Sequence, residues 1–576
     1  MLGPATRSSA TSSGSRRRRR LWRVAGALVI AGCAAAPPVT LPPSDPHTLP
    51  PATASSTEVE TAPCNQSTGG DVALEAYSEP PERPTAPGAQ SPPPVPLNIG
   101  RKPPTPEDPD AVVPDDPGLG PSMLPAPGAE DPVTPESLIL YQPPQTLAGA
   151  PTSQIAEPEV AVHGQNMMVT WNWGAAQSLD GGRTMQYLDP FRDVPPADDG
   201  FCCDQLVEHV PDQDLWLWVL QYLRVETQTG NNRVRLAVAR GDDAFARRQF
   251  KYWDFTAQDA GLADSIWFDQ PKLGLTERHL FLSINAFNPK EPFADGRFRA
   301  AVILRIDLDQ LANGQEVTPT CLTTTSFGPY PVRHARDTMY LAAHTSASVL
   351  GVWRWPDDAG SPTFHRVRDV NDQGQPVAYP LRTEPYSCQR TGAPSEAASD
   401  WCARSDDRLH SGWLAGSNLG FAWNVPADPS ASRPYPYVWA VMLDEAALTA
   451  CEAGQCVVEY PHIWSPDLAF QYATIMANER GDLGGVVLWG GGQYRLGCAV
   501  LLRDQFTAQE VGFDVLSVAA SDMDTVRPET GDYLAVTPDS PTASTWAASC
   551  MTLSRARGEH PTAVHVARFG RAQDRP

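Results

Sequence analysis

A pair of adjacent acidic and amide residues occurs twice between residues 204 and 270. Asp204-Gln205 precedes an apolar run at residues 215–218 by eleven residues, and Asp269-Gln270 precedes the run at 280–283 by the same interval, so the copies are 65 residues apart. Other polar residues hold similar places at the start of apolar runs: Glu157, Glu159, Arg333, His334, His410 and Asp532. Carboxylates that converge can bind a cation or a sugar, or act as acid and base in glycoside hydrolysis when their pKa values differ.

The repetition itself favours an architectural role for the two aspartates. A catalytic pair needs two different environments, whereas a repeat tends to supply the same environment twice. We therefore treat Asp204, Asp269 and Glu157 as catalytic candidates only, and we predict a ligand-binding role for a larger set: Glu159, Gln205, Gln270, Arg333, His334, His410 and Asp532. No spacing of His or Cys resembles a zinc site, so no metal ligands and no cofactor are predicted, although acidic residues of this kind could hold a cation such as calcium.

Strand patterns position these residues. From about Glu157 onward, short alternating or apolar runs rich in Val, Leu, Trp and Tyr are separated by Gly, Pro, Asn and Asp, which is typical of β-strands and turns. Weaker copies of the repeated strand pair occur at 159–173, 330–344, 409–424, 468–489 and 532–553. This pattern predicts an all-β fold, a β-propeller with seven blades favoured over six, and a pair of β-sandwiches is the alternative. The apolar run at 137–141 could close the ring by joining the last blade.

One eight-residue turn resembles the Asp box of sialidase-like, BNR-repeat propellers, Ser-x-Asp-x-Gly-x-Thr-Trp. It reads Ser-Leu-Asp-Gly-Gly-Arg-Thr-Met from Ser178 to Met185, with Met185 in place of Trp. The resemblance implies structural roles for Ser178, Asp180, Gly182 and Thr184. It also implies an arginine triad, a tyrosine nucleophile and an aspartic acid in a working sialidase, but the family's Arg-Ile-Pro sequence is absent, which argues against classical sialidase activity.

The first residues indicate export. Five arginines at 16–20 precede a short apolar run at 24–31, as in a signal peptide, and the sequence Ile-Ala-Gly-Cys that ends at Cys33 resembles a bacterial lipobox. We predict a signal peptide at 1–32, lipidation of Cys33, and a disordered proline-rich linker at 33–136 before a propeller at 137–576. An ordinary signal peptide cleaved after residues 34–36 is the alternative. The predicted location is the bacterial cell envelope, outside the cytoplasm and anchored to a membrane.

The remaining cysteines are consistent with an oxidising compartment. Cys451 could pair with Cys456 and Cys388 with Cys402, and Cys498 and Cys550 fall in the last two units. Cys202 and Cys203 form either a vicinal disulfide or, more easily in a strand, two thiols on opposite faces. The aromatic residues could stack on sugars but are more often core: Trp171, Trp173, Trp216, Trp218, Tyr435 and Tyr437.

The charge balance limits the partners. The formal net charge is −23 and the body has no basic patch, so a nucleic acid partner is not predicted. We expect a membrane-anchored module that binds a glycan or an envelope protein without catalysis. In a propeller the first strand of each blade lines a central channel, so the alternative is a glycoside hydrolase that uses the carboxylates at these strand starts. An assembly scaffold is a third hypothesis.

Overall fold

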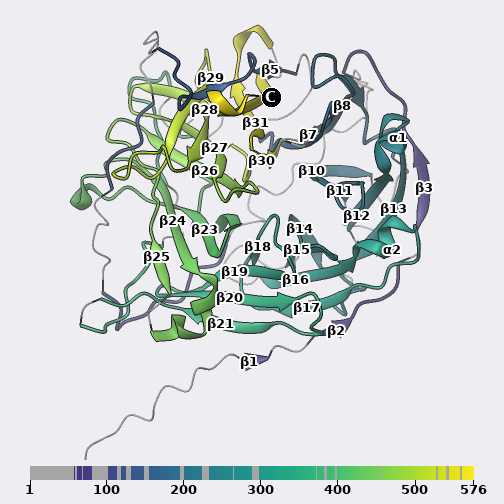
Figure 1. The fold of residues 1–576 in the computed structure, drawn as a ribbon, viewed down its shortest axis with the longest axis horizontal. Coiled ribbons are helices and arrows are strands. Elements are labelled where there is room, and N and C mark those ends of the chain that lie inside the picture. Colours follow the sequence, from purple (N-terminus) through teal and green to yellow (C-terminus); the bar gives the residue numbers. More distant parts are fainter. Residues whose placement is uncertain are drawn as a thin grey trace, which may run out of the picture. The chain divides into compact units, whose positions relative to one another are not determined.

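Seven antiparallel β-sheets follow one another along the chain and surround a common centre, as the blades of a β-propeller (Figure 1). The computed structural model describes residues 57–58, 61–67, 69–80, 102–112, 119–124, 132–147 and, with short gaps, 155–575. The gaps are at 195–199, 223–231, 264, 289–297, 372, 382–385, 396–398, 454–455, 527–529, 540–543 and 558–560. The prediction of a seven-bladed propeller is confirmed, and the alternatives of six blades and of paired sandwiches are excluded.

Each blade begins with an innermost strand and adds strands outward. Blade 1 contains β6 (Glu159–His163), β7 (Asn166–Trp171), β8 (Gly174–Ser178) and β9 (Gln186–Leu188). Blade 2 contains β10 (Phe201–Val210), β11 (Leu215–Tyr222), β12 (Arg233–Arg240) and β13 (Gln249–Thr256). Blade 3 contains β14 (Trp267–Leu275), β15 (His279–Phe287), β16 (Phe298–Asp307) and β17 (Thr320–Thr324).

The remaining blades follow the same plan. Blade 4 contains β18 (Tyr330–Pro331), β19 (Thr338–Ser346), β20 (Val349–Pro356) and β21 (Thr363–Val367). Blade 5 contains β22 (Leu409–Ala415), β23 (Asn418–Val425), β24 (Tyr437–Asp444) and β25 (Val457–Glu459). Blade 6 contains β26 (Ala469–Ala477), β27 (Leu483–Gly491), β28 (Tyr494–Arg503) and β29 (Asp514–Ala520). Blade 7 contains β30 (Ala535–Pro538), β31 (Trp546–Leu553) and β32 (Thr562–Arg571).

The helical elements of the described residues are short; all connect two strands except η4, which follows the last strand. The elements are α1 (Gly241–Ala246), α2 (Leu308–Ala312), η1 (Pro429–Ala431), η2 (Glu445–Ala453), η3 (Arg555–Arg557) and η4 (Ala572–Asp574). Among the described residues, no helix combines the length and apolarity needed to cross a membrane.

The ring is closed by a strand from before the first blade. In blade 7, β4 (Leu138–Leu140) pairs antiparallel with β32, with Leu140 opposite Phe569, and β5 (Gln145–Thr146) pairs with the same strand further along. This confirms the predicted closure by the run at 137–141. Closure by strand pairing joins the beginning and the end of the propeller and covers an otherwise open sheet edge.

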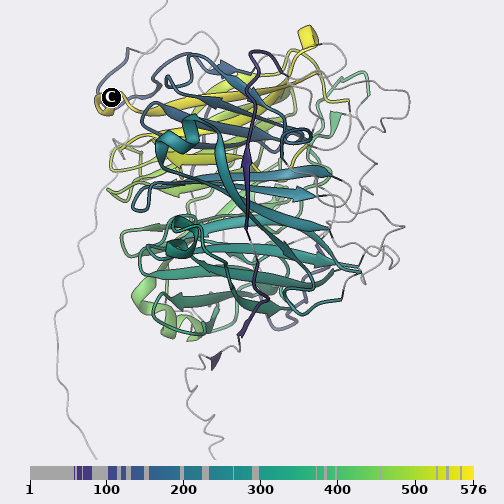
Figure 2. The same cartoon turned by 90° about the vertical axis from the view of Figure 1, so that its right-hand side faces the viewer.

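The N-terminal belt, residues 57–80, pairs with the outer edges of the blades. From its N-terminus, β1 (Thr57–Glu58) extends blade 4, β2 (Ala62–Pro63) extends blade 3, and β3 (Gly70–Ala73) extends blade 2. Figure 2 shows β3 crossing the outside of these blades. The belt continues to blade 1, where Tyr77 bridges Tyr187.

The prediction that residues 33–136 form a disordered linker is therefore wrong for the belt, which contains β1, β2 and β3. The exposed edge strands of blades 2 to 4 offer unpaired backbone groups, and a proline-rich chain can still pair with an edge over two to four residues. Residues 102–112 also contact the body, with Val112 bridging Val377. Cys33 and the signal peptide at 1–32 lie outside the described residues.

Five disulfides are present in the described part of the chain, in accord with an exported protein in an oxidising compartment. Cys388–Cys402 and Cys451–Cys456 are bonded as predicted, and Cys498–Cys550 joins blades 6 and 7. Cys64–Cys321 ties the belt to blade 3. Cys202 and Cys203 form a vicinal disulfide, so the expectation of two thiols on opposite faces is wrong; the pair lies where the register of β10 shifts, and regular alternation fails there.

Apolar side chains fill the spaces between neighbouring blades. A Cβ on Gly484 in β27 would lie 2.3 Å from the ring of Trp546 in β31, so blades 6 and 7 pack in contact only because residue 484 is glycine. The predicted aromatic candidates for sugar stacking are mostly part of this core, since Trp171, Trp216, Trp218 and Tyr437 are all at most 2% exposed.

Candidate functional site

Four carboxylates from four blades meet at the end of the propeller where the innermost strands begin. Glu157 precedes β6, Asp204 lies in β10, Asp269 in β14, and Asp532 precedes β30. They are close enough that, in addition to burial, the charges of Glu157, Asp269 and Asp532 each raise the pKa of Asp204. We call these four residues, with Arg404, Arg408 and Lys272, the carboxylate cluster.

Glu157 is the most confined member of the cluster. Its side chain is 5% exposed, and its two oxygens accept hydrogen bonds from the backbone N–H of Asp532 at 2.8 Å and from Nδ2 of Asn172 at 2.7 Å. A Cβ on Gly531 would lie 2.4 Å from Cγ of Glu157, so only glycine lets this loop approach. Burial, and next the charge of Asp532, raise the pKa of Glu157 to about 7, which favours its protonated form.

Asp532 has the opposite environment, because cations and an amide surround it. Oδ2 accepts hydrogen bonds from Nη1 of Arg408 at 3.1 Å and from Nε2 of Gln270 at 3.2 Å, and Nε of Arg404 lies 3.9 Å from Oδ1. Arg408 also makes a double hydrogen bond with Asp406, whose pKa is lowered to about 2 by this arginine against the effect of burial. Two adjacent carboxyls, Glu157 and Asp532, thus have unequal surroundings.

The repeat-related aspartates are not equivalent in space. Asp204 is 8% exposed, and burial together with the charges of Glu157 and Asp269 raises its pKa well above the usual value. Asp269 is half-buried and accepts a hydrogen bond from Nε2 of Gln221 at 3.0 Å; burial raises its pKa as well. The register of β10 shifts before Gln205 and that of β14 shifts after Asp269, so the same sequence pair faces two environments.

Because of these register shifts, the two glutamines of the repeated pairs have different hydrogen-bond partners. Gln205 is fully buried and donates to the backbone oxygens of Trp171 at 2.7 Å and Gly174 at 2.9 Å, which ties blade 2 to blade 1. Gln270 instead holds Asp532 of blade 7 and has a positive φ of 54° in its bulge. Gln205 is a structural residue here, whereas Gln270 belongs to the cluster.

Lys272 and an aromatic group lie beside the carboxylates. Lys272 is half-buried, and burial, with the charge of Arg408, lowers its pKa to about 8. Trp267, Phe287 and Phe327 pack together with the half-buried Phe298, and the Arg408 guanidinium carbon lies 5.5 Å from the centre of the Phe327 ring. Charged and aromatic surfaces therefore adjoin at this end of blade 3.

His410 lies beside the cluster in the core. It is 5% exposed, Nδ2 of Asn424 lies 2.9 Å from its Nε2, and burial with the charge of Arg408 lowers its pKa to about 4. Its neutral ring packs edge-on against Tyr472 at 5.3 Å. These contacts show that His410 is a hydrogen-bonded histidine of the core and does not face a ligand.

A second polar network, which we call the Arg333 network, contains three more of the predicted residues: Glu159, Arg333 and His334. Arg333 donates from Nη2 to Glu159 at 3.0 Å and from Nε to Glu208 at 3.0 Å, and His334 lies 3.5 Å from the same Glu208 oxygen. The Arg333, Glu159 and Glu208 side chains are at most 5% exposed. Arg333 with His334 lowers the pKa of Glu208 to about 2 against burial, whereas burial dominates at Glu159 and raises its pKa to about 7.

This network joins blades 1, 2 and 4, and only His334 in it, 32% exposed, keeps surface for a ligand. Buried ion pairs of this kind contribute to specificity of the arrangement, and breaking one leaves an uncompensated charge. Of the residues predicted to bind a ligand, the structure brings Gln270 and Asp532 to the carboxylate cluster. It places Glu159, Arg333, Gln205 and His410 in buried contacts, and it leaves His334 half-buried beside Glu208.

The arginines of the cluster, and Lys102 beside it, were not identified from the sequence. Arg404 and Arg408 precede β22 in the same way that Asp532 precedes β30, so the strand-start rule could have found them. Lys102 could not have been found, because it comes from the expected linker and forms a buried ion pair of 2.6 Å with Asp407, next to Asp406.

The turn from Ser178 to Met185 lies between the outer strands β8 and β9 of blade 1. Asp180 accepts from the backbone N–H of Thr184 at 2.9 Å and from its hydroxyl at 2.7 Å, and the N–H of Gly182 donates to Ser178 Oγ at 2.8 Å. Gly181 and Gly182 have positive φ. Asp180 and its neighbours act within this turn, away from the innermost strands.

Comparison with known proteins does not assign this chain to a family. No family model matches the chain, and no curated protein matches it. Similar solved structures include a triple arginine-to-alanine mutant of AofleA from Arthrobotrys oligospora, with 9% identity, a TM-score of 0.32, and coverage of 66% of this chain and 89% of that one. A Trypanosoma rangeli sialidase complex has 10% identity, a TM-score of 0.32, and coverage of 65% and 56%.

A glycosyl hydrolase from Bacteroides ovatus has 9% identity, a TM-score of 0.27, and coverage of 69% of this chain and 96% of that one. The chain thus spans little more than half of the trypanosomal sialidase. Similarity at these levels assigns neither a family nor an activity. The class that the fold and the site define is a seven-bladed propeller with a carboxylate and arginine cluster where its innermost strands begin.

Proposed function

We propose that the chain is an exported, lipid-anchored propeller that binds a glycan at the carboxylate cluster. One observation carries the binding role: half-buried Asp269, Lys272 and Arg404 lie with buried carboxylates that already have protein partners. The buried groups fix the blades, and the half-buried groups keep surface for a ligand. The disulfides support export, and the sequence around Cys33 supports the anchor.

A hydroxyl-rich ligand suits this arrangement best. Sugar hydroxyls both donate and accept hydrogen bonds, and Asp269 accepts while Lys272 and Arg404 donate. The adjoining Phe298 is half-buried and offers apolar surface of the kind that sugar rings cover. A polyanion is disfavoured because four carboxylates share the cluster.

A glycan array probed with the full chain tests the binding role, with Lys272→Met and Arg404→Gln as variants. Arg336→Gln is the matched control, since Arg336, between β18 and β19, is 59% exposed and pairs with Glu445 of η2. We expect both cluster variants to lose binding by about tenfold or more, which corresponds to about 1.4 kcal/mol, while the control keeps it. Equal binding by all four proteins would overturn the assignment of the cluster.

Glycoside hydrolysis is the second candidate, and the unequal surroundings of Glu157 and Asp532 favour it. A carboxyl that keeps its proton near neutral pH, as Glu157 does, can donate it to a leaving oxygen, and the arginine-paired Asp532 supplies the second carboxyl that glycoside hydrolysis requires. Fluorogenic glycosides, a sialoside included, test this with Glu157→Gln and Asp532→Asn. Turnover that both variants lose supports an enzyme, and absence of turnover on every substrate together with array binding supports the binding module alone.

The anchor has a separate test. Cells that express the full chain are grown with an alkyne-labelled fatty acid, and the chain is then isolated from the membrane fraction. We expect the label on the wild-type chain and its loss, with release from the membrane, in Cys33→Ser. An unlabelled wild-type chain would overturn the lipid anchor and leave the propeller assignment untouched.

A further inference from the structure

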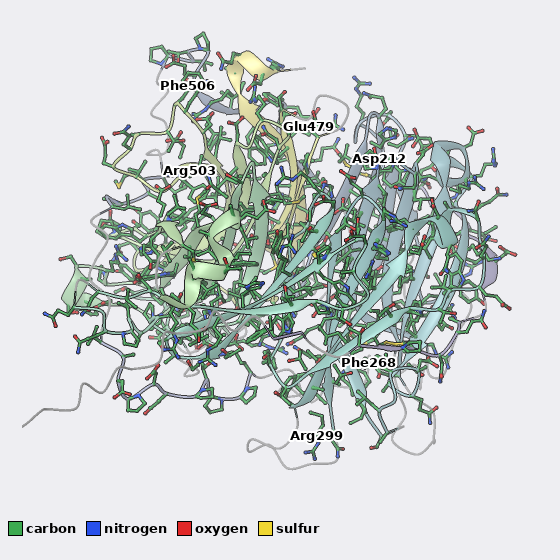
Figure 3. The ribbon with its side chains drawn as sticks, turned by 60° about the horizontal axis from the view of Figure 1, so that its bottom comes forward. Asp212, Phe268, Arg299, Glu479, Arg503 and Phe506 are labelled. Carbon is green, nitrogen blue, oxygen red and sulfur yellow. A yellow bond between two sulfur atoms is a disulfide. The ribbon has the colours of Figure 1, made fainter. Side chains whose placement is uncertain are left out.

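Two histidines and two aspartates meet between blades 1 and 2, at the end of the propeller away from the carboxylate cluster. His163 ends β6, His209 lies near the end of β10, Asp214 lies in the β10–β11 turn, and Asp242 lies in α1. One ligand atom from each lies within 4.8 Å of all the others. Figure 3 shows Asp212, in the same turn as Asp214, far from Phe268, which adjoins Asp269 of the cluster.

The distances between these ligand atoms suit a metal ion with tetrahedral coordination. Four ligands at about 2.0–2.1 Å from Zn²⁺ lie roughly 3.3–3.4 Å from one another. His163 Nδ1 is 3.1 Å from Asp242 Oδ2, and His209 Nε2 is 3.3 Å from Asp214 Oδ1. Two of the ligand pairs therefore already have the separation that a bound ion requires.

The surroundings hold the ligands and leave a way in. Trp216 Nε1 donates to Oδ1 of Asp242 at 3.1 Å, an outer hydrogen bond that orients this carboxylate, and His163 Nδ1 lies 3.2 Å from Oδ1 and 3.1 Å from Oδ2. His209 is 3% exposed, whereas the side chains of His163, Asp242 and Asp214 are 32%, 42% and 53% exposed. An ion can reach the site past the two carboxylates.

We propose that His163, His209, Asp214 and Asp242 form a binding site for a divalent transition-metal ion, with Zn²⁺ the best fit. Two imidazole nitrogens favour such an ion over Ca²⁺ or Mg²⁺, which prefer all-oxygen sites. The two imidazole rings now stack with their centres 4.1 Å apart, and they tilt toward the ion when it binds. The ion ties blade 1 to blade 2, because each blade supplies ligands.

This site cannot be recognised from the sequence, because its four ligands come from four separate places in the chain: two strand ends, one turn and one short helix. His163 and His209 are in different blades, and no short spacing relates them. The sequence predicts no metal ligands, and the proposed site departs from that prediction, because the four side chains come together only where blades 1 and 2 pack.

The test uses the full chain, treated with a chelator and then titrated with Zn²⁺ or Co²⁺. Asp242→Asn removes one ligand, and Asp243→Asn is the matched control, since Asp243 is its neighbour in α1 and its side chain is 95% exposed. We expect calorimetry to show one Zn²⁺ per chain and Asp242→Asn to weaken binding by about 100-fold, the upper end of the cost of losing even an outer-shell partner.

Two further readouts distinguish a metal site from hydrogen-bonded pairs. Co²⁺ should give visible absorption bands typical of four-coordinate nitrogen and oxygen ligation, and Zn²⁺ should raise the Tm of wild type and Asp243→Asn but not of Asp242→Asn. Ca²⁺ and Mg²⁺ should leave the Tm unchanged. Absence of Zn²⁺ binding, or equal binding by both variants, would show that the four side chains are only an inter-blade hydrogen-bond contact.

Discussion

The backbone N–H of Asp532 donates a hydrogen bond of 2.8 Å to Oε1 of Glu157, two residues that are 375 positions apart in sequence. The bond lies at the innermost strands of blades 1 and 7, whereas β4 joins blade 7 at its outer edge. The ring is therefore closed twice, once near the centre and once at the rim. A change at Glu157 acts on both the carboxylate cluster and the inner closure.

Neutralising Glu157 should make stability less sensitive to pH. The folded chain keeps a proton on Glu157 up to a pKa of about 7, while the unfolded chain loses it near the ordinary value of 4.5. This carboxyl therefore costs stability as the pH rises between those values. Relative to wild type, Glu157→Gln should gain about 1–3 kcal/mol between pH 4.5 and 7, measured by denaturant unfolding.

Glu277→Gln is the control for this series, because Glu277 is exposed. Comparing each variant with wild type at every pH cancels the titration of other groups. Parallel profiles for wild type and Glu157→Gln would contradict the buried, protonated state of Glu157.

Removing Arg333 should be among the most damaging single changes. Arg333→Met leaves Glu159 and Glu208 buried without their shared cation, and we expect a loss of about 3–5 kcal/mol in the free energy of unfolding. Arg336→Met breaks an exposed pair and should cost less than about 1 kcal/mol. Urea unfolding at neutral pH measures both, and similar losses for the two variants would contradict the buried pairing of Arg333 with Glu159 and Glu208.

Opening the Cys64–Cys321 disulfide should release the belt without dismantling the blades. The bond spans 257 residues, and its loss in Cys64→Ser/Cys321→Ser should cost about 2–4 kcal/mol. Limited proteolysis should then cut the double variant within residues 57–80 while the rest of the propeller stays intact. Cys451→Ser/Cys456→Ser, which opens a loop of sequence separation 5, should leave the belt protected.

Glycan binding should weaken at alkaline pH. Burial lowers the pKa of Lys272 to about 8, so its ammonium loses its proton as the pH rises through that value and can no longer donate a charge-assisted hydrogen bond. Affinity should fall by about tenfold between pH 7 and 9, measured by calorimetry with a ligand found on the array. Lys272→Met should bind weakly and show no such step.

The architecture could be predicted from the sequence because each blade repeats one pattern. Seven strand pairs were predicted, and each corresponds to the innermost two strands of a blade. The strand at 138–140 was recognisable because it is apolar and isolated. Periodicity of strands and turns survives in sequence even where individual residues change.

The site was only partly predictable, since register shifts decide which polar residue faces inward. Asp204-Gln205 and Asp269-Gln270 look alike, but a bulge precedes Gln205 and another follows Asp269, so Gln205 is in the core and Gln270 holds Asp532. The belt was missed because edge pairing uses backbone groups and leaves little trace in side-chain pattern.

The order in which the belt meets the blades determines how the molecule carries a mechanical load. A pull on the chain before residue 57 would reach β1 on blade 4 and then β2 on blade 3, and two-residue pairings of this kind separate easily. The covalent bond from Cys64 to Cys321 comes immediately after β2. Peeling would stop there, and the tension would pass into blade 3, leaving β3 and the inner strands unloaded.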